Sequence, residues 1–196
     1  MPRTLEFDPD HALQKAMTYF WLHGYEGTHM RDLANYMGIS KSSFYNTYGD
    51  KHQVYISALN AYMEREYAEL NKLLQTDPPP DLLLPALFFN ASARGSTEVS
   101  DQGSFLVNAA VERAPHDPET RAVIGDHFQR FADLLTEYFS RKQSAGIIAD
   151  TFRPRLHAHA LISNLYSLGV LARLNLGLQA REDVIEAAMV IYQQTA

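Results

Sequence analysis

Apolar residues recur every three to four positions along most of the chain, which is the period of an amphipathic helix. The first predicted helix begins at Asp8-Pro9-Asp10, where the aspartate can cap the helix and the proline can take its first position. Gly24 is predicted to end this helix. The apolar stripe between the two ends consists of Leu13, Ala16, Met17 and Phe20. Two short helices are predicted next, over residues 30–48.

Glycine and proline separate the remaining predicted helices. The run Thr76-Asp77-Pro78-Pro79-Pro80 ends a long helix, because proline breaks the hydrogen-bond pattern of a helix interior. The polar, serine-rich residues 95–103 are predicted as a loop. The helical ranges predicted after residue 48 are 52–74, 82–94, 105–113, 118–144, 154–176 and 182–193. No segment alternates as a strand would, so we predict an all-α fold of roughly nine helices.

The stretch from Met30 to Lys51 contains the clearest functional pattern. Residues 30–37 form a short amphipathic helix, Gly38 provides a turn, and Ser40 is the natural N-cap of a second short helix rich in hydrogen-bonding side chains. Two short helices joined at a glycine-containing turn are typical of a helix-turn-helix. The second helix of this motif can enter the major groove of DNA.

We predict two domains that meet near residue 51. Residues 1–51 would form an N-terminal three-helix helix-turn-helix DNA-binding domain, and residues 52–196 a larger helical ligand-binding and dimerisation domain. Because the boundary contains no flexible linker, the helix over 52–74 is predicted to bridge the two domains. A rigid bridge of this kind can transmit movement.

Composition excludes several classes of protein. The 196 residues are 46% hydrophobic and 20% charged, an ordinary globular balance, and the absence of cysteine excludes disulfides, thiolate metal sites and thiol-based redox sensing. The N-terminus lacks the apolar run of a signal peptide. The most hydrophobic stretch, residues 161–178, contains Asn164, Arg173 and Asn175, so we expect no membrane span and a cytoplasmic protein.

The charge of the chain is unusual for a DNA-binding protein. The net charge is −6, and residues 1–51 hold five Lys and Arg against six Asp and Glu, a net −1 that leaves −5 on the remainder. Neither part is a basic patch. Affinity for DNA would therefore come from a few placed cations, backbone amides and hydroxyls, and a dimer would double those contacts.

Residues 12–54 resemble the DNA-binding domain of the TetR family of transcriptional regulators. The matching positions are Leu13, Ala16, Phe20, Gly24-Tyr25, Thr28, Asp32-Leu33-Ala34, Gly38-Ile39-Ser40-Lys41, Phe44-Tyr45, Tyr48 and Lys51. Tyr48 stands where phenylalanine is commoner, and Lys15 stands where a second small residue is usual.

Residues 103–176 look like the ligand-binding half of one TetR subgroup, on a less specific pattern. Some relatives carry a cysteine directly after the glycine that matches Gly103, and this chain has Ser104 there. An oxidant-sensing role carried by that cysteine is therefore not available to this protein.

The candidate DNA contacts lie mostly on the second helix of the motif. Lys41 can reach a guanine or a phosphate, and Ser42 and Ser43 can reach bases or phosphates. The resemblance implies phosphate contacts from Tyr45, Tyr48 and Lys51, while Thr28 is predicted to cap the preceding helix near a phosphate. The predicted set is Thr28, Arg31, Ser40, Lys41, Ser42, Ser43, Tyr45, Asn46, Tyr48 and Lys51.

Plainer interpretations compete for some of these positions. Phe44 is predicted to be core by its apolar period. Tyr48 is either a phosphate contact or a core residue, because its ring replaces a core phenylalanine. Asn46 and Thr47 face either the groove or solvent, and Ser40 would be a helix cap in any helical protein.

Polar residues within the apolar helices of the second half suggest a small-molecule pocket, which is usually apolar with a few polar groups. The polar positions that stand out are Asn90, Asn108, His127, Arg130, Asn164 and Tyr166. The predicted pocket residues are Phe89, Asn90, Phe105, Asn108, His127, Phe128, Phe131 and Asn164. Alternatively, the aromatic rings are ordinary core and the two asparagines Asn108 and Asn164 bond each other or a helix backbone.

We expect no metal and no cofactor. His157 and His159 lie two residues apart on different faces of a predicted helix, which is poor geometry for metal ligands. Sequence motifs of enzymes are also missing, since no Gly-x-Ser-x-Gly, His-Glu-x-x-His, Walker-type loop or dinucleotide fingerprint occurs. A helical-bundle enzyme is therefore the least favoured interpretation.

The preferred interpretation is a homodimeric repressor that an unknown small-molecule effector releases from a near-palindromic double-stranded DNA operator. The helices over 154–176 and 182–193 are the predicted dimer surface. Their stripes of small and apolar residues are Ala160, Ser163, Ser167, Val170, Leu171, Leu174, Val184, Ala188, Ile191 and Tyr192. The alternatives are that these stripes face the chain's own core, and that the protein is a DNA-binding dimer without any effector.

Overall fold

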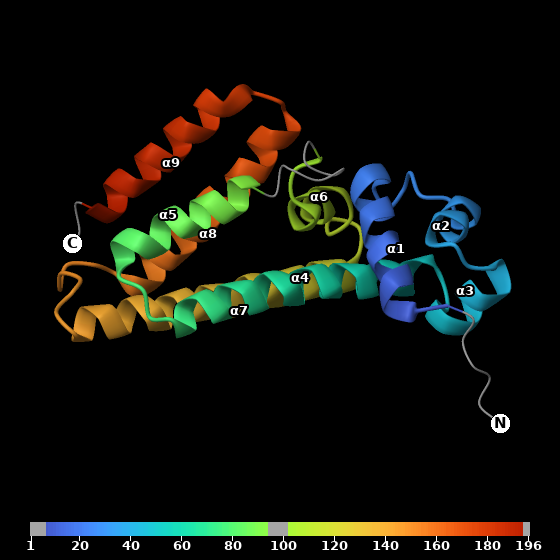
Figure 1. Ribbon diagram of the computed structural model, residues 1–196, viewed down its shortest axis with the longest axis horizontal. Helices are drawn as coiled ribbons and strands as arrows, with labels where there is room; N and C mark the ends of the chain where they lie inside the picture. Colours follow the sequence, from blue (N-terminus) through green and yellow to red (C-terminus); the bar gives the residue numbers. More distant parts are fainter. Residues whose placement is uncertain (1–6, 94–101, 194–196) are drawn as a thin grey trace.

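The computed structural model describes residues 7–93 and 102–193, and within these ranges it contains nine α-helices and no strand (Figure 1). The helices are α1 (Pro9–His23), α2 (Met30–Met37), α3 (Lys41–Tyr48), α4 (Lys51–Gln75), α5 (Pro80–Ala93), α6 (Phe105–Glu112), α7 (Pro118–Ser144), α8 (Pro154–Arg173) and α9 (Gly177–Gln193). The predicted all-α fold is confirmed. Most of the loop predicted over 95–103 lies outside the described residues.

Helix ends follow the predicted capping chemistry. Asp8 accepts a hydrogen bond from the backbone N–H of Asp10 at 3.0 Å, and Ser40 accepts one from the N–H of Ser43 at 3.0 Å. Gly38 takes a left-handed conformation (φ 75°) that a residue with a side chain would adopt only with strain. It ends α2 and starts the turn to α3.

The last two helices differ from the prediction at the turn between them. α8 ends at Arg173 and α9 already begins at Gly177, five residues before the predicted start. Residues 178–181 are Leu, Gln, Ala and Arg, which all favour helix, so they extend α9 toward its N-terminus.

The molecule contains two hydrophobic cores. The first contains α1, α2, α3, the N-terminal part of α4, and α6, through residues such as Phe20, Leu33, Phe44, Leu59 and Phe105. The second contains the C-terminal part of α4 with α5, α7, α8 and α9. α6 lies in the predicted second domain by sequence, yet it packs on the N-terminal helices.

α4 is the element that joins the two cores. It runs unbroken for 25 residues, which corresponds to about 37 Å. Val54 to Met63 pack in the first core, whereas Leu70 and Leu74 pack in the second. The predicted continuous helix over 52–74 is therefore confirmed.

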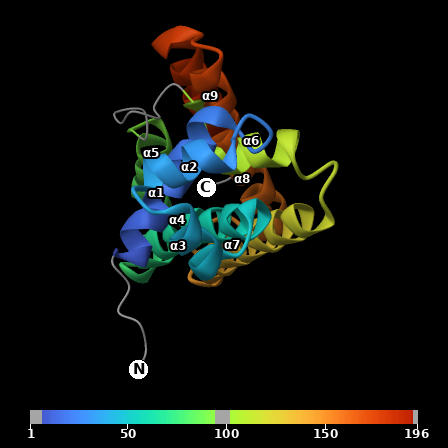
Figure 2. The ribbon, with the colours of Figure 1, turned by 90° about the vertical axis from the view of Figure 1, so that its right-hand side faces the viewer.

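The views in Figures 1 and 2 place the helix-turn-helix at one end of the molecule. α4 and α7 run side by side along its length, and α5, α8 and α9 cover the half away from α1, α2 and α3. In the part of the chain that the structure describes, no helix has the length and apolarity needed to cross a membrane.

Candidate nucleic-acid interface and internal cavity

α3, the second helix of the helix-turn-helix, is anchored by a single buried ring. Phe44 has no exposed surface, and its ring centroid lies 5.8 Å from that of Tyr45 and 5.7 Å from that of Tyr48. Ile39, in the turn before α3, is also buried. The prediction that Phe44 belongs to the core is confirmed.

The opposite face of α3 is polar and open to solvent. Lys41, Ser42, Tyr45 and Asn46 are exposed, and 44% of Tyr45 is accessible. The Lys41 ammonium lies 5.9 Å from the centroid of the Tyr45 ring, so the two side chains share one patch. This arrangement suits a helix that inserts its first turn into a groove.

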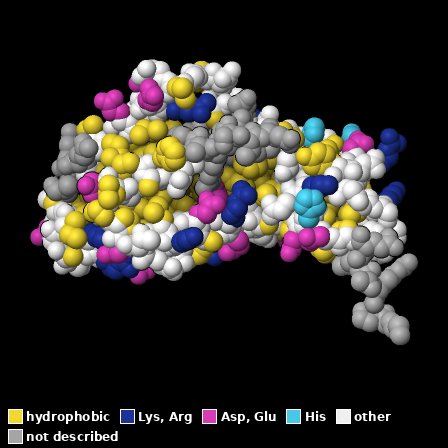
Figure 3. Space-filling model, viewed as in Figure 1, with side chains coloured by type: hydrophobic (Ala, Val, Ile, Leu, Met, Phe, Trp, Pro, Cys, Tyr) yellow, Lys and Arg dark blue, Asp and Glu magenta, His cyan; other side chains and the backbone are white. Residues whose placement is uncertain are grey.

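The two serine hydroxyls of Ser40 and Ser43 lie 2.9 Å apart and bond each other at the start of α3. They remain near the surface, because Ser40 is exposed and Ser43 is half-buried. Arg31, on the first turn of α2, has 88% of its side chain exposed and only a 3.9 Å contact with Asp32. Figure 3 shows Lys and Arg side chains at this end of the molecule.

Lys51, the first residue of α4, is held against an aromatic ring. Its ammonium lies 4.3 Å from the centroid of Tyr25, and burial lowers the pKa of Lys51 from its ordinary value. The side chain is half-buried. Lys51 is thus a positioned cation close to the C-terminal end of α3.

Thr28 does not take the predicted place at a helix start. The N-cap of α2 is His29, and Thr28 is only 1% exposed, with its hydroxyl donating to the carbonyl oxygen of Gly24 at 2.6 Å. The prediction that Thr28 caps α2 is therefore wrong. Its hydroxyl instead closes the turn after α1.

Tyr48 uses its hydroxyl proton inside the protein. The hydroxyl donates to the carbonyl oxygen of Pro9 at 2.7 Å and so ties the end of α3 to the start of α1. A phenol has one proton to donate. A phosphate contact from Tyr48 would require this bond to break.

We expect Tyr48→Phe to lower the free energy of unfolding by about 1 kcal/mol, the usual contribution of one hydrogen bond, and to leave DNA affinity nearly unchanged. Urea denaturation and titration with duplex DNA would measure the two quantities. A large loss of DNA affinity at unchanged stability would contradict this expectation and would make the hydroxyl a phosphate contact.

The second half of the molecule contains a partly open cavity of about 80 Å³ between α4, α5, α7, α8 and α9. This volume can hold several waters or a small molecule, and it is below the ~300–1,000 Å³ of sites for drug-sized ligands. Apolar side chains form most of the wall. The polar or charged side chains in the wall belong to Tyr62, Glu66, Glu69, Asn90, Ser104, Tyr166 and Arg181.

Two of the eight predicted pocket residues, Asn90 and Phe131, line this cavity. Phe89 lies on the outer face of α5 and is 71% exposed. Phe105 belongs to the first core, where its ring contacts Trp21 and Tyr62. The rings of Phe89 and Phe105 are therefore not part of the cavity wall.

The other four predicted pocket residues also lie outside the wall. Asn108 donates its amide N–H to the carbonyl oxygen of Gln102 at 2.8 Å, and the backbone carbonyl of Asn164 accepts from the hydroxyl of Ser167 at 2.7 Å. Phe128 packs its ring near His159 and Tyr166. His127 lies behind the wall, with Nε2 3.7 Å from the Glu66 carboxylate. Helical periodicity shows that a residue is buried, but the partner of each buried face depends on tertiary packing.

Glu66 is the main cavity residue that sequence reasoning missed. It is 4% exposed and stands on the apolar stripe of α4 between Met63 and Leu70. A carboxylate that falls on the apolar stripe of a helix, three to four residues from its apolar neighbours, is expected to be buried with them. This signal was present in the sequence. Among the described residues, no group of three His, Cys, Asp or Glu side chains is placed to hold a metal ion.

The comparisons with known proteins agree with this architecture. Residues 12–58 match the family model for bacterial regulatory proteins of the tetR family. The chain is 30% identical over 139 residues to the uncharacterized HTH-type transcriptional regulator YezE of Bacillus subtilis (strain 168), covering 71% of this chain and 70% of that protein. It is 24% identical over 150 residues to the HTH-type transcriptional repressor BdcR of Escherichia coli (strain K12), covering 76% and 75%.

A solved structure extends the similarity over the whole chain. It is a cysteine mutant of the TetR family transcriptional regulator CifR complexed with 26-bp double-strand operator DNA, with a TM-score of 0.82, 26% identity and 100% of both chains covered. The helix-turn-helix with an exposed polar recognition helix, the two helical cores and these relatives lead to one assignment. The chain belongs to the TetR family, and it is a DNA-binding transcriptional regulator and not an enzyme.

Proposed function

We propose that this protein is a homodimeric repressor that a small molecule releases from a near-palindromic operator. The observation that carries the proposal is the continuity of α4. One unbroken helix begins beside α3 and ends in the wall of a partly open cavity. A regulator that releases DNA on binding a ligand needs such a connection.

The exposed face of α3 is the proposed reading surface. Lys41, Ser42 and Asn46 would face base edges, while Tyr45, Lys51 and Arg31 would contact phosphates. Ser40 and Ser43 would present their paired hydroxyls at the start of the helix. The repressor role is supported by the similarity to BdcR, which is named a repressor, and by the CifR complex with operator DNA.

The proposed dimer surface lies on α8 and α9. Exposed apolar side chains there are Val170 on α8, Leu178 and Val190 on α9, and Leu174 and Leu176 in the turn between the two helices. Exposed apolar residues gathered on neighbouring helices are typical of a protein interface. Ala188 and Tyr192, from the predicted stripe, are buried in the chain's own core. A dimer would place two copies of α3 about one turn of DNA apart, ~34–36 Å.

The proposed coupling runs through α4. Tyr62, Glu66, Glu69, Leu70 and Leu73 of this helix line the cavity, so a ligand there touches the same rigid element that starts at Lys51. The coupling required is on the order of 1–3 kcal/mol. The ligand must bind one arrangement of α4 more tightly than the other, since equal affinity shifts nothing.

The small volume of the cavity favours one alternative, a DNA-binding dimer whose second half binds no effector. A thermal-shift screen of small molecules followed by DNA titration separates the two functions. We expect a compound that raises the unfolding temperature to weaken binding to a near-palindromic duplex selected from a random library with this protein. A screen in which every stabilising compound leaves DNA affinity unchanged would favour the alternative.

Ala172→Leu provides the matched control for that screen. Ala172 lines the cavity, and the larger side chain would fill part of the space. We expect the variant to bind DNA as the unmodified chain does and to lose its response to the compound. A response that persists would place the compound at another site.

A further inference from the structure

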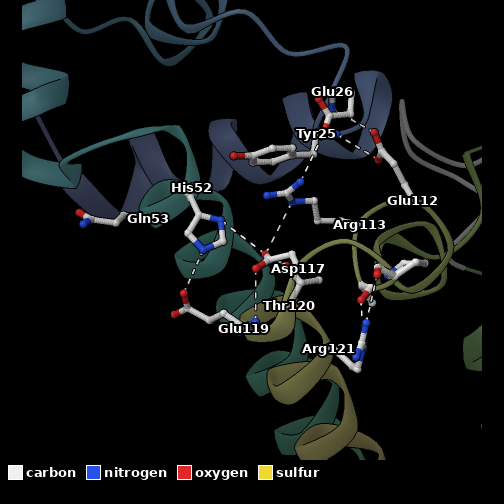
Figure 4. Close-up of polar contacts among 12 residues, drawn as sticks. Tyr25, Glu26, His52, Gln53, Glu112, Arg113, Asp117, Glu119, Thr120 and Arg121 are labelled. Carbon is white, nitrogen blue, oxygen red and sulfur yellow. Dashed lines mark hydrogen bonds and ion pairs between the residues drawn. The ribbon is translucent and has the colours of Figure 1, made fainter.

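The corner between α6 and α7, residues 112–121, is attached by polar contacts to the DNA-binding helices (Figure 4). We propose that Glu112 and Arg113 in this corner are positioning residues for DNA binding. They lie outside α2 and α3, and they hold these two helices in the arrangement that binds DNA. The inference rests on the proposed reading surface of α3.

Glu112 binds the turn that follows α1. One carboxylate oxygen accepts from the backbone N–H of Tyr25 at 3.0 Å, and the other accepts from the N–H of Glu26 at 3.0 Å. Hydrogen bonds to an ionised acceptor are stronger than neutral ones. The carboxylate also fills the space beside Gly24, where an added Cβ would lie 2.7 Å from one of its oxygens. Glu112 therefore fixes the backbone at the exit of α1.

Arg113 reaches the same turn and the start of α7. Its guanidinium lies 4.3 Å from the centroid of the Tyr25 ring, with Nη1 3.3 Å from a Glu26 oxygen and Nε 3.6 Å from an Asp117 oxygen. The Lys51 ammonium lies 4.3 Å from the centroid of the same ring. Tyr25 thus lies between Arg113, which directly follows α6, and Lys51, the cation proposed to contact a phosphate.

The start of α7 holds the start of α4. Asp117 caps α7, accepting hydrogen bonds from the N–H of Glu119 and the hydroxyl of Thr120. His52, the neighbour of Lys51, places Nδ1 3.6 Å from Asp117 and Nε2 2.9 Å from Glu119. The corner therefore contacts the chain in the turn between α1 and α2, and again directly after α3, at the start of α4.

Apolar packing supports the same attachment. Phe105, Leu106 and Ala109 of α6 are buried in the first core. The indole N–H of Trp21 donates to the carbonyl oxygen of Gly103 at 3.1 Å. Because binding costs free energy for every group that must be ordered, a helix-turn-helix held in advance binds DNA more tightly than a loose one.

Because Glu112 is negatively charged, the proposal can be tested by the direction in which its replacement changes the affinity for DNA. Glu112→Gln removes one negative charge from a chain of net charge −6, so long-range electrostatics alone would strengthen binding to DNA. The amide also presents an NH2 group to one of the two backbone donors, which breaks one hydrogen bond. Positioning therefore predicts weaker binding, the opposite result.

The experiment uses the full chain and the selected near-palindromic duplex. We expect Glu112→Gln to bind it roughly tenfold more weakly, about the effect of one charge-assisted hydrogen bond. The slope of log K against log salt should stay unchanged, because no phosphate contact is lost. Hydrogen exchange at the amides of Tyr25 and Glu26 should become faster. Glu137→Gln is the control, since this carboxylate is 70% exposed and lies 3.9 Å from Arg141 on α7.

A second variant keeps the test decisive if Glu112→Gln fails to fold. Arg113→Lys retains the charge but loses the planar group on Tyr25, and we expect weaker DNA binding with the same salt slope. Binding as tight as that of the unmodified chain in a folded Glu112 variant, or unchanged amide exchange, would overturn the proposal. If instead the proposed reading surface of α3 is wrong, a Lys41 variant would bind DNA as tightly as the unmodified chain. This result distinguishes that failure from a failure of the positioning proposal.

Discussion

We expect that replacing Lys41 by alanine and Tyr45 by phenylalanine in one chain weakens binding to the selected duplex by at least about a hundredfold. A lysine at a base edge or phosphate contributes roughly 1–3 kcal/mol, and a tyrosine hydroxyl adds about 1 kcal/mol. Both side chains lie on the exposed face of α3, and a dimer would lose each contact twice. We therefore expect the effect to exceed that of any other pair of surface substitutions.

Fluorescence anisotropy at several salt concentrations would measure this loss and assign it. If Lys41 contacts a phosphate, the slope of log K against log salt falls in magnitude by about 0.9 per contact. If Lys41 contacts a base, the slope of log K against log salt stays unchanged, and the variant discriminates less between DNA sequences. Lys72→Ala is the control, because Lys72 is exposed in the last turn of α4, away from α3. Undiminished binding by the double variant would mean that α3 is not the reading helix.

Phe44→Ala is expected to have the largest effect on stability. The ring has no exposed surface, and removing a fully buried phenylalanine costs about 3–5 kcal/mol through lost burial and the cavity left behind. Total stabilities of domains are only about 5–15 kcal/mol, so the loss is a large fraction. Without this anchor α3 detaches from α2 and α4, and DNA binding should disappear.

The chain offers an internal probe for this experiment. Trp21 is the single tryptophan, and it is buried in the first core. Its fluorescence during urea denaturation reports the unfolding of that core. Tyr45→Ala, at the neighbouring position, is the control, and we expect it to change the midpoint little because 44% of Tyr45 is exposed. Equal midpoints for Phe44→Ala and the unmodified chain would contradict the anchoring role.

Local signals in the amino-acid order account for the secondary structure and for the reading helix. Asp8 and Ser40 cap helices where they were expected to, because a side-chain oxygen and the amides it accepts from lie within three residues. α4 runs unbroken from Lys51 to Gln75 since no proline or glycine interrupts it. Such short-range chemistry is readable without coordinates.

Contacts between distant segments had to come from the folded molecule. α6 looks like any short apolar helix, and its placement on the first core depends on surfaces more than 80 residues away, as in the bond from Trp21 to Gly103. The same holds for the cavity, where Asn90 and Phe131 line the wall and Phe105 does not. Periodicity predicts that a helix face is buried, but apolar burial is non-directional. Which element packs against that face is therefore decided only when the helices pack together.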